Sequence, residues 1–169
     1  MIPPRPIDIR LTLDQIEFCK RMAVARDGAA DEGNLHETRS YGGDGRREPS
    51  WYGTFGEGAV CAAYGLELEK YIKANGKDGG VDVVINDKTY SVKATTSPNY
   101  NLIIPPHQDF DTDRALLVWP TQVVSTWSLV GWCTREMWDE LKTKANNMPT
   151  PTWRVSWRDL KQIEREELR

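Results

Sequence analysis

Apolar residues near the start of the chain recur at helical spacing. Residues 12–26 carry them at steps of about three and four positions, which predicts an N-terminal helix. Thr12 and Gln15 have the spacing of a capping box, and Leu11 and Ile16 have that of a hydrophobic staple around it. The helix is therefore expected to begin at Thr12.

A second helical pattern covers residues 55–73. Its apolar side chains fall at three- and four-residue steps and define a face that is expected to be buried. The members of this face are Val60, Cys61, Tyr64, Leu68 and Tyr71. Glu57 is expected in the first turn, where the helix dipole favours a carboxylate, and on the same stripe, so that it points toward the sheet that the helix covers.

Residues 80–93 predict a β-hairpin, because two runs rich in β-branched residues flank an Asn-Asp-Lys turn sequence. Successive side chains of a strand point to opposite faces, so Ser91 and Lys93 are expected on one face. With a two-residue turn, Asp82 lies opposite Ser91 or Lys93 and shares their face. A three-residue turn would shift the parity and separate the acid from the amine.

Further strands are predicted by runs of large apolar and β-branched residues. These runs lie at residues 101–106, 115–119, 123–130 and 153–157. Thr134 is expected to cap a helix that continues to about Lys144, and a charged helix is expected over residues 159–168.

The order of these elements predicts an α/β fold with a central mixed sheet flanked by helices, in a single domain over residues 1–169. Residues 28–50 are rich in glycine and charged residues, which is typical of a long mobile loop. Residues 53–132 carry the main motifs. Residues 133–169 are expected to form a C-terminal helix, strand and helix.

Composition narrows the functional classes. Charged residues make up 28% and hydrophobic residues 39%, as in ordinary folded domains, and the first residues lack the apolar core of a signal peptide. No apolar run approaches the roughly 20 residues of a membrane span. Three separated cysteines and two isolated histidines argue against a disulfide framework and a zinc site, and favour a reducing cytoplasm. Since the net charge is −3, nucleic-acid binding would need a local basic patch.

Two carboxylates near a lysine suit a hard divalent cation and an activated water. Magnesium takes oxygen ligands and keeps several waters, so one or two protein carboxylates suffice beside a substrate phosphate. Glu57 and Asp82 are the candidate ligands, with the backbone carbonyl of Val92 as another. Lys93 is the candidate group for positioning the attacking water. The structural alternative is that the Asp–Lys pair is a half-exposed ion pair, which contributes less than about 1 kcal/mol.

A resemblance to a known family is carried by residues 53–60, Asp82 and the triplet Ser91-Val92-Lys93. Together they resemble the PD-(D/E)xK nuclease superfamily, and specifically the small phage-encoded nuclease-like proteins, in which a Gly-x-x-Gly-Glu-x-Ala-Val helix precedes an Asp and an x-Val-Lys strand. The specific part is a handful of residues. The resemblance implies a restriction-endonuclease-like fold whose magnesium site, with manganese as a substitute ion, cleaves DNA phosphodiester bonds.

Two positions depart from the family pattern. Val81 stands where a proline often precedes the first acid, which is a minor change. Ser91 occupies the place of the (D/E)xK acid, and a hydroxyl is a weaker cation ligand than a carboxylate. Some restriction endonucleases carry a serine here and recruit a carboxylate from elsewhere, a part that Glu57 would fill. The alternative is a degenerate site on a fold that is retained for binding.

Basic residues near this site are the candidate DNA contacts, although each one alone is more simply a solvated side chain. They are Arg39, Arg46 and Arg47 in the loop, and Lys73 and Lys77 after the second helix. Most of the seven tryptophans are expected in the core, and only Trp51, beside the loop, is a candidate for stacking on a base.

The sequence therefore predicts a cytoplasmic Mg²⁺-dependent DNA nuclease, acting in the host cytoplasm if the chain is phage-encoded, with Mn²⁺ as the second candidate ion. The alternative function is a catalytically degenerate nuclease-fold module that binds DNA or a phage or host protein. A third and weaker alternative is a structural component of a phage assembly. Endonuclease or exonuclease mode, DNA or RNA preference and oligomeric state stay open at this stage.

Overall fold

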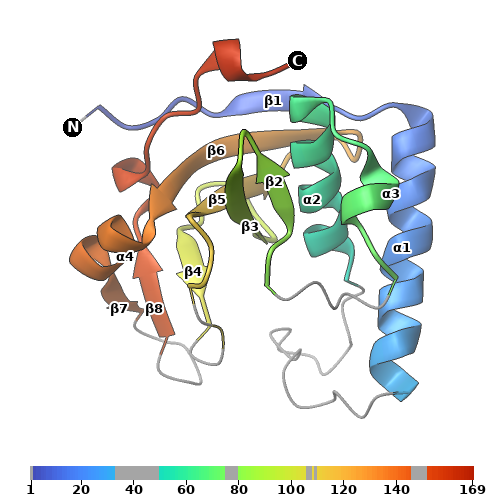
Figure 1. Ribbon diagram of the computed structural model, residues 1–169, viewed down its shortest axis with the longest axis horizontal. Helices are drawn as coiled ribbons and strands as arrows, with labels where there is room; N and C mark the ends of the chain where they lie inside the picture. Colours follow the sequence, from blue (N-terminus) through green and yellow to red (C-terminus); the bar gives the residue numbers. More distant parts are fainter. Residues whose placement is uncertain (1, 33–49, 75–79, 106–107, 109, 146–151) are drawn as a thin grey trace.

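The chain folds as a mixed α/β structure with two sheets (Figure 1). The computed structural model describes residues 2–32, 50–74, 80–105, 108, 110–145 and 152–169. The helices are α1 (Leu13–Glu32), α2 (Trp51–Tyr64), α3 (Leu68–Tyr71) and α4 (Arg135–Leu141), with two short 3-10 turns, η1 (Trp157–Asp159) and η2 (Arg165–Glu167). The strands are β1 (Ile7–Arg10), β2 (Val83–Ile85), β3 (Lys88–Ala94), β4 (Leu102–Ile104), β5 (Arg114–Pro120), β6 (Thr126–Thr134), β7 (Thr143–Ala145) and β8 (Thr152–Val155).

The larger sheet has five strands in the order β1-β6-β5-β3-β2. Strands β3 and β5 are parallel, and the other neighbouring pairs are antiparallel, so the sheet is mixed as expected. The smaller sheet is antiparallel, in the order β4-β8-β7. Strand β2 has only three residues and forms one edge of the larger sheet.

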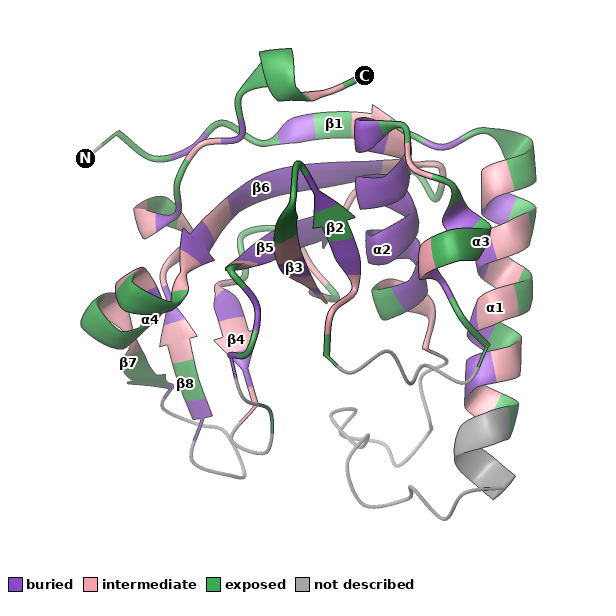
Figure 2. Ribbon diagram, in the orientation of Figure 1, coloured by how far each residue is buried: buried purple, intermediate pink, exposed green. Residues whose placement is uncertain are grey.

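Each face of the larger sheet is covered by a hydrophobic core of its own. On one face, Leu116 and Val118 of β5 share a cluster with apolar residues of α1, α2 and α3. On the other face, Ala115, Leu117 and Trp119 share a cluster with residues of β4, β8 and α4. Figure 2 shows the central strands and α2 as largely buried between these layers. Because both cores use the same sheet, the described residues form one domain.

Helix α1 begins as the capping pattern predicts. The backbone N–H of Thr12 donates to Gln15 Oε1 at 2.9 Å, and the N–H of Gln15 donates to Thr12 Oγ1 at 3.2 Å. Leu11 and Ile16 are both buried in the helix-side core. The predicted end was wrong, because the helix continues through Glu32 and so includes the first part of the expected loop. Residues 33–49 of that loop lie outside the described residues.

The single helix expected over residues 55–73 is instead two helices, α2 and α3. Gly65 ends α2 in the left-handed conformation, with φ 63°, and its N–H donates to Ala62 O at 3.4 Å. The N–H of Leu66 then donates to Cys61 O at 2.8 Å, which completes a Schellman-type end. Helix α2 also begins earlier, at Trp51, so Glu57 is in its second turn and the expected dipole interaction in the first turn was wrong.

The hairpin has the predicted two-residue turn. Val83 pairs with Tyr90 and Ile85 pairs with Lys88, which leaves Asn86 and Asp87 as the turn. Both turn residues have positive φ, 49° and 60°, as a type I′ turn requires. The two-residue turn on which the expected position of Asp82 depends is therefore confirmed, and Asp82 itself directly precedes β2.

The other strand predictions are confirmed with shifted bounds for β4, β5, β6 and β8. Strand β6 starts only at Thr126, because Val123 and Val124 lie exposed in the preceding turn. Thr134 caps α4 by accepting from the Met137 N–H at 3.3 Å, but the helix ends at Leu141 and is followed by β7. The sequence analysis missed both β1 and β7.

The helix expected over residues 159–168 was wrong. There Lys161 pairs with Trp132 of β6 through two backbone hydrogen bonds, at 2.8 and 3.1 Å. Gly131 makes room for this segment, because a Cβ at that position would lie 2.7 Å from the Lys161 carbonyl oxygen. With Leu160 and Ile163 buried, tertiary pairing overrides the helical charge pattern and leaves two short 3-10 turns.

Candidate functional site

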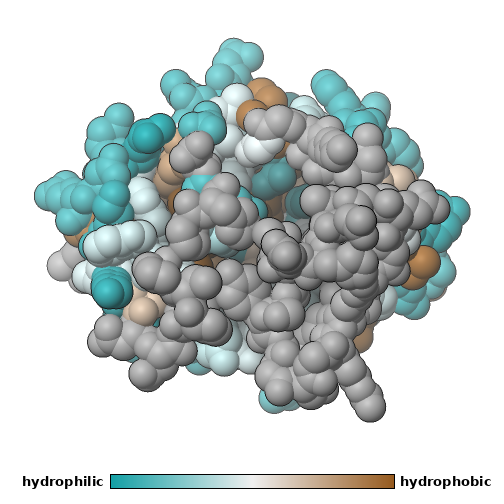
Figure 3. All heavy atoms as spheres, turned by 90° about the horizontal axis from the view of Figure 1, so that it is seen from below, coloured by the Kyte–Doolittle hydropathy of each residue, from teal (hydrophilic) through white to brown (hydrophobic). Residues whose placement is uncertain are grey.

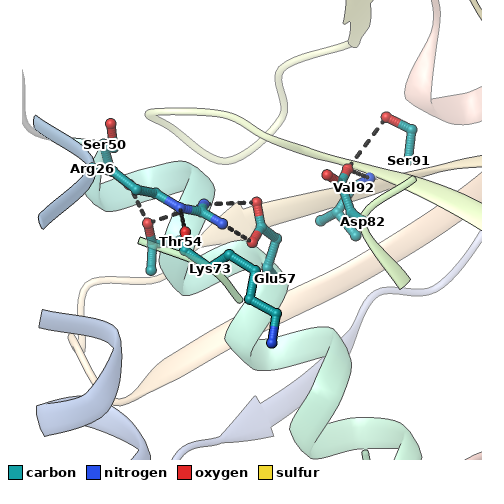
Figure 4. Close-up of polar contacts among 8 residues, drawn as sticks. All are labelled: Arg26, Ser50, Thr54, Glu57, Lys73, Asp82, Ser91 and Val92. Carbon is teal, nitrogen blue, oxygen red and sulfur yellow. Dashed lines mark hydrogen bonds and ion pairs between the residues drawn. The ribbon is translucent and has the colours of Figure 1, made fainter. Parts of the chain in front are cut away.

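Asp82 lies where the polypeptide enters the hairpin, next to the start of β2. Its backbone N–H donates to Tyr90 O at 2.9 Å, although Tyr90 pairs in register with Val83, so the ladder is irregular at this point. Its carboxylate oxygen Oδ2 accepts from the Val92 N–H at 2.6 Å and from the Ser91 hydroxyl at 3.4 Å (Figure 4). The hairpin thus fixes the side chain of Asp82 against the triplet that the sequence analysis singled out.

The carboxylate of Asp82 reaches the edge of β3, where this strand extends past the end of β2. In a strand, the N–H and C=O of one residue point to the same side, so the Val92 carbonyl faces the same edge as the N–H that Asp82 binds. A carboxylate, a hydroxyl and a backbone carbonyl are therefore gathered at one place by local hairpin geometry. Asp82, Ser91 and Val92, together with Lys93 on the same strand, are called the hairpin half of the site below.

Lys93 is half-buried on the same strand, two residues beyond Ser91. Its ammonium group donates to Gln108 Oε1 at 2.8 Å, and the Gln108 N–H is held by Pro105 O at 2.9 Å. Burial lowers the pKa of Lys93 below its usual 10.5, and the negative charges of Asp82 and then Glu57 oppose this shift. Both carboxylates therefore act on the same ammonium group.

Glu57 lies buried between α2 and α1, in an ion pair with Arg26. The two guanidinium N–H groups Nη1 and Nη2 donate to Glu57 Oε1 and Oε2 at 3.0 and 2.9 Å, which is a bidentate fork (Figure 4). Arg26 also donates to Lys73 O at 2.9 Å and to Thr54 Oγ1 at 3.4 Å. Arg26, Thr54 and Glu57 are called the helix half of the site below.

Two glycines flank Glu57 and allow α2 to approach both of its neighbours closely. A Cβ at Gly56 would lie 2.8 Å from the Ala94 Cβ of β3, and a Cβ at Gly58 would lie 2.5 Å from the Cys19 sulfur of α1. The Gly-Glu-Gly run thus places the carboxylate where helix, helix and hairpin meet. The charge of Glu57 adds to burial in raising the pKa of Cys19 to about 12.

The two halves approach the sheet from opposite faces. Ser91 and Lys93 pair in register with Ala115 and Leu117, whose side chains belong to the core on the side of β4 and β8. Glu57 comes from α2, which covers the other face. The expectation that Glu57 points at the sheet was thus wrong in detail, because its carboxylate is turned toward α1 and Arg26. The two halves are joined where α2 packs on β3 at Gly56 and Ala94.

The oxygen donors at this edge fit a strongly hydrated magnesium ion better than a fully protein-ligated one. Among the described residues, no group of three or more His, Cys, Asp or Glu side chains is arranged to hold a metal ion. The Asp82 carboxylate, the Ser91 hydroxyl and the Val92 carbonyl are oxygen donors of the kind that magnesium prefers, and this ion commonly keeps several waters. Asp82 is the first candidate ligand, because Arg26 already uses both oxygens of Glu57.

Of the basic residues in the loop and after the second helix that were predicted to contact DNA, only Lys73 lies among the described residues. Arg39, Arg46, Arg47 and Lys77 lie outside the described residues. Lys73 is exposed, and its ammonium group donates to the Glu69 carbonyl. Trp51 stacks on Phe55 with ring centroids 4.5 Å apart, so one of its faces is used inside the fold. Seen from below the view of Figure 1, the described residues around the margin are mostly hydrophilic (Figure 3).

Sequence reasoning missed two residues that hold the predicted ones in place. Arg26 had a usable signal, since it continues the buried stripe of α1 through Cys19 and Ala23, where an apolar residue is expected. A buried arginine is expected to have a paired charge, and in the structure this partner is Glu57. Gln108 had no such signal, because only the folded position of the segment after β4 brings it to Lys93.

None of the described helices combines the length and the apolar character that crossing a bilayer requires. Comparison of the chain with protein-family models, with curated proteins and with solved structures found no match. The fold and the candidate site are therefore described from the residues of this chain alone. The chain has a mixed α/β fold, with a hairpin that carries Asp82 and Lys93 and a buried ion pair between Arg26 and Glu57.

Proposed function

We propose that this protein is a Mg²⁺-dependent DNA nuclease of the restriction-endonuclease-like type, which hydrolyses phosphodiester bonds at the hairpin half of the site. The observation that carries the proposal is the Asp82 carboxylate, which is held at the edge of β3 by the Val92 N–H. Lys93 lies on the same strand, where the negative charges of Asp82 and Glu57 act on its ammonium group. Mn²⁺ is the second candidate ion. DNA is the proposed partner, in the cytoplasm or in the host cytoplasm if the chain is phage-encoded.

Each residue has a distinct part in this proposal. A bound magnesium ion would supply charge for a phosphate oxygen and acidify a water. Asp82 and the Val92 carbonyl would hold this ion, and Ser91 orients the Asp82 carboxylate through its hydroxyl. Lys93 positions the attacking water, since Gln108 fixes its ammonium group and burial lowers its pKa toward the range where it can exchange a proton.

A second function is favoured by the helix half of the site. Glu57 is paired with Arg26, and Ser91 brings no charge, so Asp82 is the one carboxylate that the hairpin half contributes. This arrangement suits a nuclease-fold module that binds DNA, or a phage or host protein, without turnover. The two functions predict different results in one experiment.

The experiment incubates supercoiled plasmid and single-stranded DNA with the protein in Mg²⁺, in Mn²⁺ and in EDTA. Nicking that needs the cation, and that Asp82→Asn and Lys93→Met each abolish, supports the nuclease. The matched control is Asp139→Asn, an exposed acid on α4 that is remote from this edge and should leave nicking unchanged. Retention of DNA without cleavage in any cation would favour the binding module and refute the nuclease.

A further inference from the structure

A polar pocket opens at one end of the larger sheet, where β3 and β5 begin and β6 runs into α4. Its volume is about 340 Å³, and the residues that line it are all polar or charged. The charged ones are three cations, Lys88, Arg114 and Arg135, and two acids, Asp113 and Glu136. This pocket is called the strand-end pocket below. None of the residues of the hairpin half lines it.

The two acids of the strand-end pocket are held by neutral donors. The carboxylate oxygen Oδ2 of Asp113 accepts from the N–H and from the hydroxyl of Thr89, at 2.8 and 3.0 Å. Hydrogen bonds from its own backbone N–H and from Thr134 lower the pKa of Glu136. Neither acid forms an ion pair with a described residue. Their charges are therefore fixed in place, but they do not pair with the cations of the pocket.

The cations of the pocket lack a close counter-ion. The ammonium group of Lys88 is exposed, and no hydrogen bond or ion pair joins it to a described residue. Arg135 is 3.8 Å from Asp111 and 4.0 Å from Asp139, long contacts between side chains that are each more than half exposed and that contribute little. Three cations against two acids leave one net positive charge, which favours an anionic ligand.

Arg114 is the cation that is already ordered for binding. Its guanidinium carbon lies 3.8 Å from the centroid of the Trp132 ring, and its Nη1 donates to the Tyr90 hydroxyl at 2.7 Å. A guanidinium has five N–H donors, and Arg114 has no other acceptor among the described residues. An ordered side chain loses little conformational entropy when a ligand binds, and a planar fork matches two oxygens of a phosphate.

We propose that the strand-end pocket binds a phosphate group, with Arg114 as the ordered fork and Lys88 as the second charge. As a DNA contact the pocket rests on the proposed function, because a strand that passes the hairpin half would supply the phosphate. Lys88 precedes Ser91 by three positions on β3, roughly 10 Å along the strand. This span equals about three steps of one DNA strand along the helix axis. One strand is thus long enough to contact both places.

The first test is a titration with inorganic phosphate. The isotope-labelled full chain is titrated at constant ionic strength, with chloride as the reference anion, and amide NMR spectra are recorded. We expect saturable shifts at the residues of the strand-end pocket with phosphate only. Lys88→Met and Arg114→Lys should each weaken this binding several-fold. Lys88 has no partner to lose within the described fold, so Lys88→Met should keep the wild-type melting temperature.

The second test measures the binding of fluorescent single-stranded and duplex DNA by anisotropy, in EDTA and at several salt concentrations. Loss of one phosphate contact in Lys88→Met should reduce the slope of log affinity against log salt by about 0.7 for single strands and about 0.9 for duplex. The matched control is Lys161→Met. Its ammonium group lies 5.2 Å from the centroid of the Trp132 ring, but Lys161 does not line the pocket, so the slope should stay unchanged.

Each outcome decides for or against the pocket. Phosphate shifts at the pocket together with a reduced slope in Lys88→Met support a contact to the DNA backbone. Phosphate shifts with an unchanged slope support the phosphate pocket and assign it to free phosphate instead of DNA. The absence of localised phosphate shifts overturns the proposal. Equal losses in Lys88→Met and Lys161→Met also overturn it, because the effect would then be one of overall charge.

The pocket and the nuclease fail in different ways, since both titrations are made without a divalent cation and without cleavage. A protein that shows the phosphate shifts and the reduced slope, yet never nicks DNA in Mg²⁺ or Mn²⁺, would keep the pocket and refute the nuclease. A wild type that nicks DNA but shows no phosphate shifts at the pocket would keep the nuclease and overturn the pocket alone.

Discussion

The hairpin half and the helix half of the candidate site are built by different physics. The hairpin half joins residues that are nine or ten positions apart, and its geometry follows from a two-residue turn and the alternation of side chains. The helix half joins Arg26 and Glu57, which are 31 positions apart on two helices. Its geometry depends on how closely α2 packs against α1 and β3.

The difference also concerns exposure. Asp82 and Lys93 have intermediate exposure, so water partly screens their charges. Arg26 and Glu57 are buried, so the loss of either one breaks a buried ion pair. The candidate site therefore has a partly exposed half at the edge of β3 and a buried half between α1 and α2.

The largest expected effect is on the helix half. In EDTA, Arg26→Gln should lower the free energy of unfolding by about 3–5 kcal/mol, because it breaks a buried ion pair from one side. The double variant Arg26→Gln/Glu57→Gln should recover most of this loss, since neither buried charge remains. Urea unfolding followed by circular dichroism measures both values, and equal stability of the single and the double variant would contradict the coupling.

The matched change in the hairpin half is Asp82→Asn, which keeps an oxygen to accept from the Val92 N–H. We expect a cost of only about 1 kcal/mol, the net contribution of an ordinary hydrogen bond. A cost as large as that of Arg26→Gln would mean that the two halves do not differ in the way described here.

The next effect concerns the contact that joins the two halves. Gly56→Ala should cost about 1–3 kcal/mol, because the added Cβ would lie 2.8 Å from the Ala94 Cβ and would push α2 away from β3. Gly53→Ala on the same helix is the control, since a Cβ there meets nothing within 4 Å. It should gain about 0.5–1 kcal/mol from helix propensity. Thermal unfolding of both variants tests this, and a stabilised Gly56→Ala would rule out the close approach.

Local chemistry explains which parts of this structure could be predicted from the sequence. The start of α1 was predictable because Thr12 and Gln15 satisfy each other's backbone N–H groups within one turn. The hairpin and the position of Asp82 were predictable because a two-residue turn fixes the register. In both cases the interacting residues are neighbours in sequence, and no distant element takes part.

All but one of the failures have the opposite property, and the exception is the end of α2. The end of α2 at Gly65 had a glycine signal, but the apolar stripe continued past it and was given too much weight. The segment after Asp159 has a helical charge pattern, yet Lys161 pairs with Trp132 of β6. Arg26 and Gln108 likewise act on residues that only the tertiary fold brings near. Such contacts have no fixed spacing, so periodicity cannot reveal them.

The smallest expected effect is a pH dependence in the hairpin half. Burial lowers the pKa of Lys93 in the folded state, against the pull of Asp82 and Glu57, whereas the unfolded chain has the usual value of 10.5. Between these two values the unfolded state binds more protons, so the contribution of Lys93 to stability rises with pH across this window. Below the window, the charged ammonium group lowers the stability of the fold.

The substitution Lys93→Met isolates this effect, because the wild type and the variant share all other titrating groups. The stability of Lys93→Met relative to the wild type should be highest at about pH 7 and should decrease as the pH approaches and passes 10.5. Urea unfolding of both proteins at several pH values measures this difference. If this difference in stability stays constant, or grows with pH, burial does not lower the pKa of the Lys93 ammonium group. Lys93 would then behave as an ordinary surface lysine.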